Sequence, residues 1–334
     1  MTKRILSGMQ PTNQLHLGNY LGALRNWVKM QDAGEYETLF CVVDLHAITA
    51  TYDPAKLRQS TREIAAAYIA AGVDPEKSIL FPQSAVPAHS QLMWLLATMT
   101  QMGKLNRMTQ FKDKAGKNKE KAGLGLYSYP VLMAADILIY KATHVPVGDD
   151  QRQHLELARE IAGTFNHRYG QDYFPEPESV IMGEGARIMS LRNGGEKMSK
   201  SAPSDMTRIN LTDDADLIAQ KIRKAKTDPE PLPETFAELE ERPEAKNLVT
   251  IYAALADITG DAVMAEFAGK TFSEFKPALC DLAVGHLAPI SARMNELLAD
   301  TAQIDAYLQR GADRANEIAK PHIDEVLDLM GFWR

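Results

Sequence analysis

The chain has 334 residues, of which 45% are apolar and 24% charged, an ordinary balance for a globular protein. Its formal net charge of −7 argues against a protein that coats nucleic acid regardless of sequence, although local basic patches can still bind RNA. No apolar run is long enough to span a membrane. The cysteines, Cys41 and Cys280, lie far apart and suit neither a disulfide framework nor a zinc or iron–sulfur site, so we expect a cytoplasmic protein.

The first half of the chain alternates strand-like and helix-like segments. Short apolar runs predict strands at 4–7, 39–44, 78–81 and 144–147. Apolar residues at helical spacing, with capping signals at the ends, predict helices at 18–30, 53–72, 87–102, 129–140 and 150–166. The alternation predicts an α/β fold with a doubly wound, parallel, Rossmann-like sheet, and it places ligands at the carboxyl ends of the strands.

The composition changes after about Ser201. A proline-rich, acidic break at 227–233 is followed by amphipathic patterns that predict helices at 247–259, 277–298, 304–310 and 314–330. We therefore predict a Rossmann-like domain at 1–204 and a helical C-terminal domain at 205–334. The first domain includes a lysine-rich segment at 104–121, which is either a solvated surface or an RNA contact.

A first motif, HLGN at His16–Asn19, follows the first predicted strand at the start of a helix. Free N–H groups at such a helix start attract phosphate. Gly18 lacks a side chain that would block a flat base or ribose, while His16 and Asn19 offer short hydrogen-bonding groups. Taken alone, a helix start with a glycine at a packing point explains the motif better.

A second motif, KMSKS, occupies 197–201 and follows the flexible sequence Asn193-Gly194-Gly195. Two lysines three residues apart on a glycine-hinged loop can close over a polyphosphate, and the serine hydroxyls add neutral donors. A five-residue sequence of this kind is improbable as a random surface loop.

Together, the motifs resemble the HIGH and KMSKS signatures of class I aminoacyl-tRNA synthetases. The final Asn19 of the first motif, in a positioning role without charge, resembles the tryptophanyl/tyrosyl branch. Further strings are similar to bacterial tryptophanyl-tRNA synthetases: VVDLHAIT, RMTQFKDK, YPVLMAADIL, VPVGDDQRQH and GARIMSL. The resemblance implies activation of L-tryptophan by ATP with a substrate-bound Mg²⁺, transfer to tRNA(Trp), a homodimer and a helical domain that binds the anticodon.

Asp136 is an acid within the apolar segment 129–138. It either touches solvent or caps a neighbour, or it is buried and needs a hydrogen-bond donor. An indole N–H is a donor only, so a carboxylate facing an apolar pocket suits tryptophan and penalises phenylalanine, but it discriminates less clearly against tyrosine.

The resemblance also implies individual site residues. Those for ATP are Gln10, Pro11, Thr12, His16, Gly18, Asn19, Gly148, Asp149, Asp150, Ile188, Lys197, Met198, Ser199, Lys200 and Ser201. Those for tryptophan are Asp136, Met133, Tyr129, Gln151, His46, Val145, Val147, Leu6 and Gly8. Gln10, Lys197 and Lys200 are the expected catalytic residues, with the lysines neutralising the leaving pyrophosphate.

Alternatives remain open at the level of the sequence. His46 is also explained as a structural histidine, and Ile188 as an ordinary core residue. Tyrosyl-tRNA synthetases share both motifs, and a noncatalytic synthetase paralogue or a small-molecule nucleotidyltransferase are further readings. Two intact motifs and a long helical tail weigh against the last two.

Overall fold

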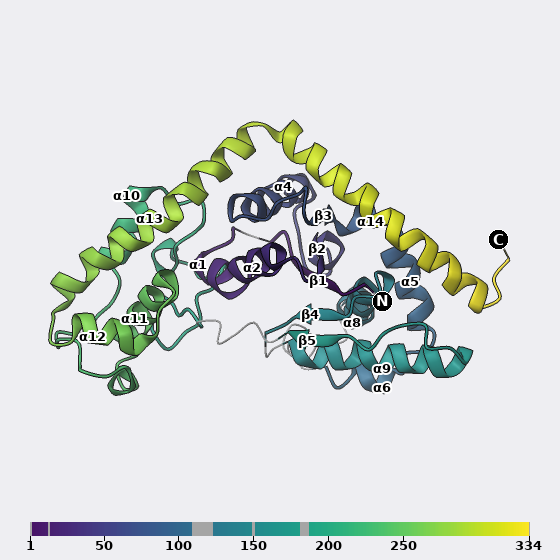
Figure 1. Ribbon diagram of the computed structural model, residues 1–334, viewed down its shortest axis with the longest axis horizontal. Helices are drawn as coiled ribbons and strands as arrows, with labels where there is room; N and C mark the ends of the chain where they lie inside the picture. The colour runs from purple at the N-terminus through teal and green to yellow at the C-terminus, as the bar shows by residue number, and fades with distance from the viewer. Residues whose placement is uncertain (1, 13, 109–122, 149–150, 181–186, 334) are drawn as a thin grey trace.

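The computed structural model describes residues 2–12, 14–108, 123–148, 151–180 and 187–333 (Figure 1). Within them, parallel strands form one five-stranded sheet in the order β3-β2-β1-β4-β5. The strands are β1 (Arg4–Met9), β2 (Glu37–Val42), β3 (Ile79–Pro82), β4 (His144–Pro146) and β5 (Glu178–Val180). The predicted doubly wound fold is confirmed. Because the strand order reverses between β1 and β4, a ligand crevice is expected at their carboxyl ends.

The two faces of the sheet are covered by different helices. One face packs against α1 (Leu17–Asn19), the π-helical turn η1 (Tyr20–Leu24), α2 (Arg25–Ala33) and α4 (Pro54–Ala70). The other packs against α5 (Ala88–Ala97), α8 (Leu124–Ile139) and α9 (Arg152–Tyr169). Along β2, Phe40 and Val42 join the first apolar cluster and Leu39 and Cys41 the second, as the alternation of a strand requires.

Several predicted boundaries were wrong by a few residues. The strand at 39–44 ends at Val42, because Asp44 already begins the short helix α3 (Asp44–Ala47). The helix at 87–102 ends at Ala97, and a separate α6 (Met102–Leu105) follows. β5 was not predicted, since its three residues, ESV, carry no apolar run.

The C-terminal segment is helical, as predicted. It contains η5 (Asp205–Thr207), α10 (Ala215–Arg223), η6 (Phe236–Leu239), α11 (Pro243–Ala256), α12 (Gly260–Phe267), α13 (Phe272–Ala299) and α14 (Thr301–Leu329). The two helices predicted at 304–310 and 314–330 are one helix, α14. In Figure 1, α13 and α14 form two long limbs that meet above the sheet, with α10, α11 and α12 beside α13. The division at 204/205 stays a prediction, since α14 packs on the first segment.

Helix α14 covers the edge strand β3 at close range. Gly311 meets β3 so tightly that a Cβ atom there would overlap the carbonyl oxygen of Leu80. One helical turn on, the Arg314 guanidinium donates to the carbonyls of Pro75 and Ser78, each at 3.2 Å. The helix therefore pairs backbone groups near a sheet edge that would otherwise be exposed.

No single helix among the described residues has the length and apolar content of a membrane span; a sharply bent pair, α11 with α12, reaches them jointly by length and composition alone.

Replacing Gly311 with alanine should lower the free energy of unfolding by about 1–3 kcal/mol, because the added methyl forces α14 away from β3. Urea denaturation measures the change. Gly285→Ala is the matched control, since Gly285 also lies inside a long helix but has open space around its Cβ position. In Gly285→Ala the free energy of unfolding should rise by up to about 1 kcal/mol, because alanine favours a helix more than glycine does. Equal effects of both substitutions would contradict the close packing of α14.

Candidate functional site

Backbone hydrogen bonds join the HLGN segment to the chain that follows the KMSKS segment. The stretch 15–17 pairs antiparallel with 209–211, which follows the KMSKS loop. Leu17 N–H donates to the Ile209 carbonyl at 2.8 Å, and Leu211 N–H donates to the Leu15 carbonyl at 2.9 Å. Segments almost 200 residues apart in the sequence thus form one structural unit beside the carboxyl end of β1.

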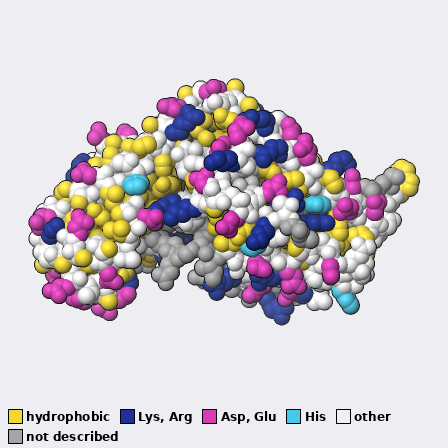
Figure 2. Space-filling view, in the orientation of Figure 1, with side chains coloured by type: hydrophobic (Ala, Val, Ile, Leu, Met, Phe, Trp, Pro, Cys, Tyr) yellow, Lys and Arg dark blue, Asp and Glu magenta, His cyan; other side chains and the backbone are white. Residues whose placement is uncertain are grey.

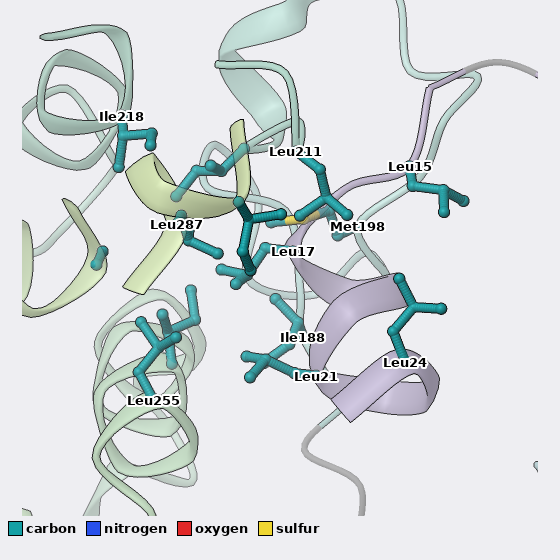
Figure 3. Close-up of a cluster of buried hydrophobic side chains, with 14 of the residues drawn as sticks. Leu15, Leu17, Leu21, Leu24, Ile188, Met198, Leu211, Ile218, Leu255 and Leu287 are labelled. Atoms are coloured by element: carbon teal, nitrogen blue, oxygen red, sulfur yellow. The ribbon is translucent and has the colours of Figure 1, made fainter. Parts of the chain in front are cut away.

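An apolar cluster lies beneath this unit. Leu17, Ile188, Met198 and Leu211 pack together in Figure 3, each at most 3% exposed. Gly18 lies directly over Ile188, where a Cβ atom would come within 3.7 Å of the isoleucine Cβ. The burial of Ile188 and Met198 favours a packing role for these two side chains, which were expected beside the nucleotide.

His16 is buried and neutral. Its Nδ1 accepts the Gly18 N–H at 3.1 Å, and the side chain of Asn19 accepts the His16 N–H, so the two residues cap α1 reciprocally. Burial, followed by the positive charges of Lys200 and Arg208, lowers the pKa of His16 to about 4. Since Nδ1 is an acceptor, the neutral ring carries its proton on Nε2, which leaves one N–H donor for a ligand.

The KMSKS loop reaches the segment that follows β1. The Lys200 ammonium donates to the carbonyl oxygen of Thr12 at 3.1 Å, and burial lowers the pKa of Lys200 to about 8. Lys197 is exposed, and the hydroxyls of Ser199 and Ser201 lie 3.0 Å apart. Cationic and neutral donors therefore gather around the start of α1, which is the chemistry that a polyphosphate needs.

A buried carboxylate, that of Asp136, lies against residues that follow the carboxyl ends of β2 and β3. Asp136 of α8 is 4% exposed and accepts hydrogen bonds from His46 Nε2 at 2.9 Å, Gln83 Nε2 at 2.7 Å and His89 Nδ1 at 2.7 Å. Burial alone would raise the pKa of Asp136, but the hydrogen bonds and charges of His46 and His89 outweigh it and hold the pKa below its ordinary value. The carboxylate is ionised and held in one orientation.

The remaining expected tryptophan residues come from elements around this carboxylate. Tyr129 and Met133 lie on the same face of α8 as Asp136, at helical spacing. Leu6 and Gly8 lie on β1, Val145 on β4, Val147 and Gly148 directly after it, and Gln151 at the start of α9. Gly8 passes so close to β2 that a Cβ atom would overlap the Cys41 carbonyl oxygen. Gln10 and Pro11 follow β1 beside Thr12.

Some expected residues lie outside the described residues. These are Asp149 and Asp150, together with 109–121 of the lysine-rich segment. Within its described part, the Lys104 ammonium pairs with the Glu160 carboxylate at 2.9 Å.

Other residues of the site were not predicted. Gln83 and His89 orient Asp136, and the Tyr140 hydroxyl lies 2.8 Å from the far nitrogen of His89. Gln83 immediately follows β3, and a polar residue at a strand's carboxyl end is a signal that could have found it. Arg208 and Asn210, which adjoin His16, had no such signal, because only the fold brings them there.

Comparisons with known proteins agree on one family. Residues 2–284 match the family described as tRNA synthetases class I (W and Y). The chain is 60% identical to a tryptophan–tRNA ligase of Caulobacter vibrioides over 331 residues, covering 99% of this chain and 96% of that protein. It is 55% identical to one of Rhizobium meliloti over 347 residues, covering 98% of each.

Solved structures give the same result. Tryptophanyl-tRNA synthetase from Mycoplasma pneumoniae superimposes with a TM-score of 0.87 and 32% identity, covering 100% of this chain and 99% of that one. The Campylobacter jejuni tryptophanyl-tRNA synthetase, complexed with ADP and tryptophan, gives 0.83 and 33%, covering 98% and 100%.

Asp136→Asn should lower the free energy of unfolding by about 2–4 kcal/mol at pH 7, because an amide replaces an ionised acceptor facing three donors. The lowered pKa of Asp136 sets the pH dependence. Its contribution is complete above the ordinary pKa of 3.8 and is lost as pH falls below it. Urea denaturation of both proteins between pH 7 and pH 3.5 should show the difference shrinking at the acid end. A difference that stays constant would contradict an ionised, stabilising carboxylate.

Proposed function

The chain belongs to the class I tRNA synthetases for tryptophan and tyrosine, and from this membership we propose how its residues activate L-tryptophan with ATP and transfer it to tRNA(Trp). The tyrosine-specific alternative is not favoured, since the near full-length relatives named above are tryptophan–tRNA ligases. Both signature motifs are intact, which also weighs against a noncatalytic paralogue.

The observation that carries the tryptophan assignment is the oriented carboxylate of Asp136. A carboxylate offers about four acceptor sites, and the three donors named above leave one. The indole N–H fills that remaining site. An amino acid without this donor leaves a buried charge incompletely paired, and this is the basis of selection.

The rest of the pocket surrounds the ring and the amino acid backbone. Tyr129, Met133, Val145, Val147 and Leu6 wall the indole, and Gly8 leaves room at β1. Gln151 holds the α-amino group. His46 has a bond to Asp136, so its role is at least to orient that carboxylate, with ring contact as a second role.

Adenylation requires the tryptophan carboxylate to attack the α-phosphorus in line with the departing pyrophosphate. The nucleotide lies against the start of α1, between Gln10, Pro11, Thr12, Gly18 and Asn19 on one side and Gly148 on the other. Asp149 and Asp150, which lie outside the described residues, are expected nucleotide contacts from the resemblance alone. His16 donates its Nε2–H to phosphate. Lys197 and Lys200 neutralise the charge that develops on pyrophosphate, and the hydroxyls of Ser199 and Ser201 donate hydrogen bonds to it.

Magnesium enters as part of the substrate MgATP. Among the described residues, no group of three or more His, Cys, Asp or Glu side chains converges as a metal cage. Mg²⁺ in nucleotide sites is generally bound through substrate phosphates and waters with one or two carboxylates.

In the second step, a ribose hydroxyl of the terminal tRNA adenosine attacks the adenylate, and the helical segment 205–334 contacts the anticodon. Figure 2 shows acidic side chains gathered at the lower left, over this segment. Exposed Glu234, Glu238, Glu240 and Glu241 lie in it. These acids repel phosphate, so tRNA contacts a different face of the segment.

The chain is proposed to act as a homodimer in the cytoplasm. Trp94 and Met102 are each 69% exposed and Leu124 is 77% exposed, and they lie on the neighbouring helices α5, α6 and α8. Large apolar side chains exposed together are typical of a protein interface, and a second copy would cover them. Both cysteines are buried and unbridged, as suits a reducing compartment.

Discrimination between tryptophan and 3-benzothienylalanine, in which sulfur replaces the indole N–H, tests the role of Asp136. In amino acid-dependent pyrophosphate exchange, the wild type should prefer tryptophan in kcat/KM by about a hundredfold or more. Asp136→Ala should reduce this preference to a few fold, as judged by the same principle. Asp44→Asn is the control, because Asp44 is a nearby buried acid bonded to Ser84. An unchanged preference in folded Asp136→Ala would rule out the indole contact.

The pKa of Lys200, lowered by burial to about 8, predicts an alkaline limit to activity. At saturating tryptophan, kcat/KM for ATP should fall as pH rises through about 8, because the free enzyme loses the ammonium charge. In Lys200→Arg the guanidinium stays charged, so this fall should disappear even if the rate is lower. The same fall in the arginine variant would assign it to another group.

A further inference from the structure

The KMSKS segment begins on a small antiparallel hairpin at 188–198, which contains Lys197 and ends two residues before Lys200. The Ser190 N–H donates to the Glu196 carbonyl at 2.7 Å, and the Met198 N–H donates to the Ile188 carbonyl at 3.0 Å. Met189 and Lys197 lie opposite each other between these bonds. The position of the first strand therefore determines where the KMSKS segment begins.

The outer edge of this hairpin is bound by one side chain of the helical segment. Backbone groups alternate in direction along a strand, so the N–H and C=O of Met189 point away from the KMSKS strand. Asn247 of α11, 3% exposed, binds both: its Oδ1 accepts the Met189 N–H at 2.8 Å, and its Nδ2 donates to the Met189 carbonyl at 3.0 Å. The Asn247 amide thus pairs with both backbone groups of Met189, as a residue of a neighbouring strand would.

The turn of the hairpin meets the same helix. Gly194 is buried against the first residues of α11, and a Cβ atom there would overlap the backbone of Pro243 and Glu244. The hairpin is therefore in contact with α11 at its turn and, through Asn247, at its strand.

The opposite end of α11 makes a separate contact with the Rossmann-like segment. Asp257, just beyond the last residue of α11, pairs with Arg25 of α2 at 2.7 Å and with Lys29 at 3.4 Å. No bond that the structure gives to Asp257 involves the hairpin. The pairing of Asp257 with Arg25 and Lys29 therefore joins the helical and Rossmann-like segments without contacting the KMSKS hairpin.

We propose that Asn247 is a positioning residue, which sets the place of Lys197 and Lys200 over the triphosphate by holding the backbone of Met189. The proposal rests on the function proposed above. Asn247 is bonded to the hairpin backbone and to none of the residues expected to bind tryptophan. Misplacing a catalytic group by about 1 Å lowers rates by up to about a hundredfold, so a loosened hairpin should impair the use of ATP and spare tryptophan binding.

The test compares Asn247→Ala with Asp257→Asn, which tolerates the left-handed backbone at that position. In tryptophan-dependent pyrophosphate exchange, Asn247→Ala should lower kcat/KM for ATP by about tenfold or more. Its Kd for tryptophan, measured by equilibrium dialysis, should stay within about twofold of the wild-type value, since the pocket is untouched. Asp257→Asn should leave both quantities within about twofold, because it does not contact the hairpin.

Two further variants keep the test decisive if Asn247→Ala is unstable. Asn247→Ser keeps one hydroxyl in place of the amide and cannot bind both Met189 groups, so its loss in kcat/KM for ATP should be intermediate. Gly194→Ala displaces the turn and should give the same split between ATP and tryptophan.

An unchanged kcat/KM for ATP in folded variants overturns the role of Asn247, and so does an equally large rise in the Kd for tryptophan. Either result leaves the proposed function intact. A wild type without tryptophan-dependent exchange overturns the proposed function itself.

Discussion

The site depends on the backbone pairing between 15–17 and 209–211. One strand of this pair leads into α1 and presents His16 and Gly18, and the other follows the KMSKS loop. Because the bonds are between main-chain groups, they hold the two motifs together without using the side chains that face a ligand. The apolar cluster beneath includes Met198, so it anchors the KMSKS segment at that residue (Figure 3). Packing and the donors proposed for phosphate thus belong to neighbouring residues of the same two segments, such as Met198 and Lys200.

The second organising feature is the ionised, buried carboxylate of Asp136. Burying a charge is unfavourable unless donors surround it, and here Gln83, His46 and His89 supply them from elements that follow β2 and β3. A carboxylate held in this way can select a ligand by one hydrogen bond, because its own orientation is already determined. In the proposed function, recognition of tryptophan and stability of the fold are therefore linked through one side chain.

Much of this arrangement could be predicted from residues close together in the sequence. β2 was predictable because a strand covered on both faces is a continuous apolar run, and Asp136 because an acid stands out in an apolar helix. β5 was not, since three mixed residues carry no pattern. Contacts between distant segments could not be predicted in this way. Asn247 is an ordinary polar residue in the sequence, and only the fold places it against Met189, 58 positions away. Local sequence patterns predict helices and strands, whereas the site is formed by contacts between segments that are distant in the sequence.

We propose that the oriented carboxylate of Asp136 selects tryptophan through its indole N–H, in a pocket whose walls fit the indole ring. ATP–pyrophosphate exchange by the purified protein, measured with each of the twenty amino acids in turn, tests it most directly. We expect exchange with tryptophan and, by comparison, negligible exchange with tyrosine or phenylalanine. Exchange that is equally fast with tyrosine, or absent with tryptophan, would contradict it.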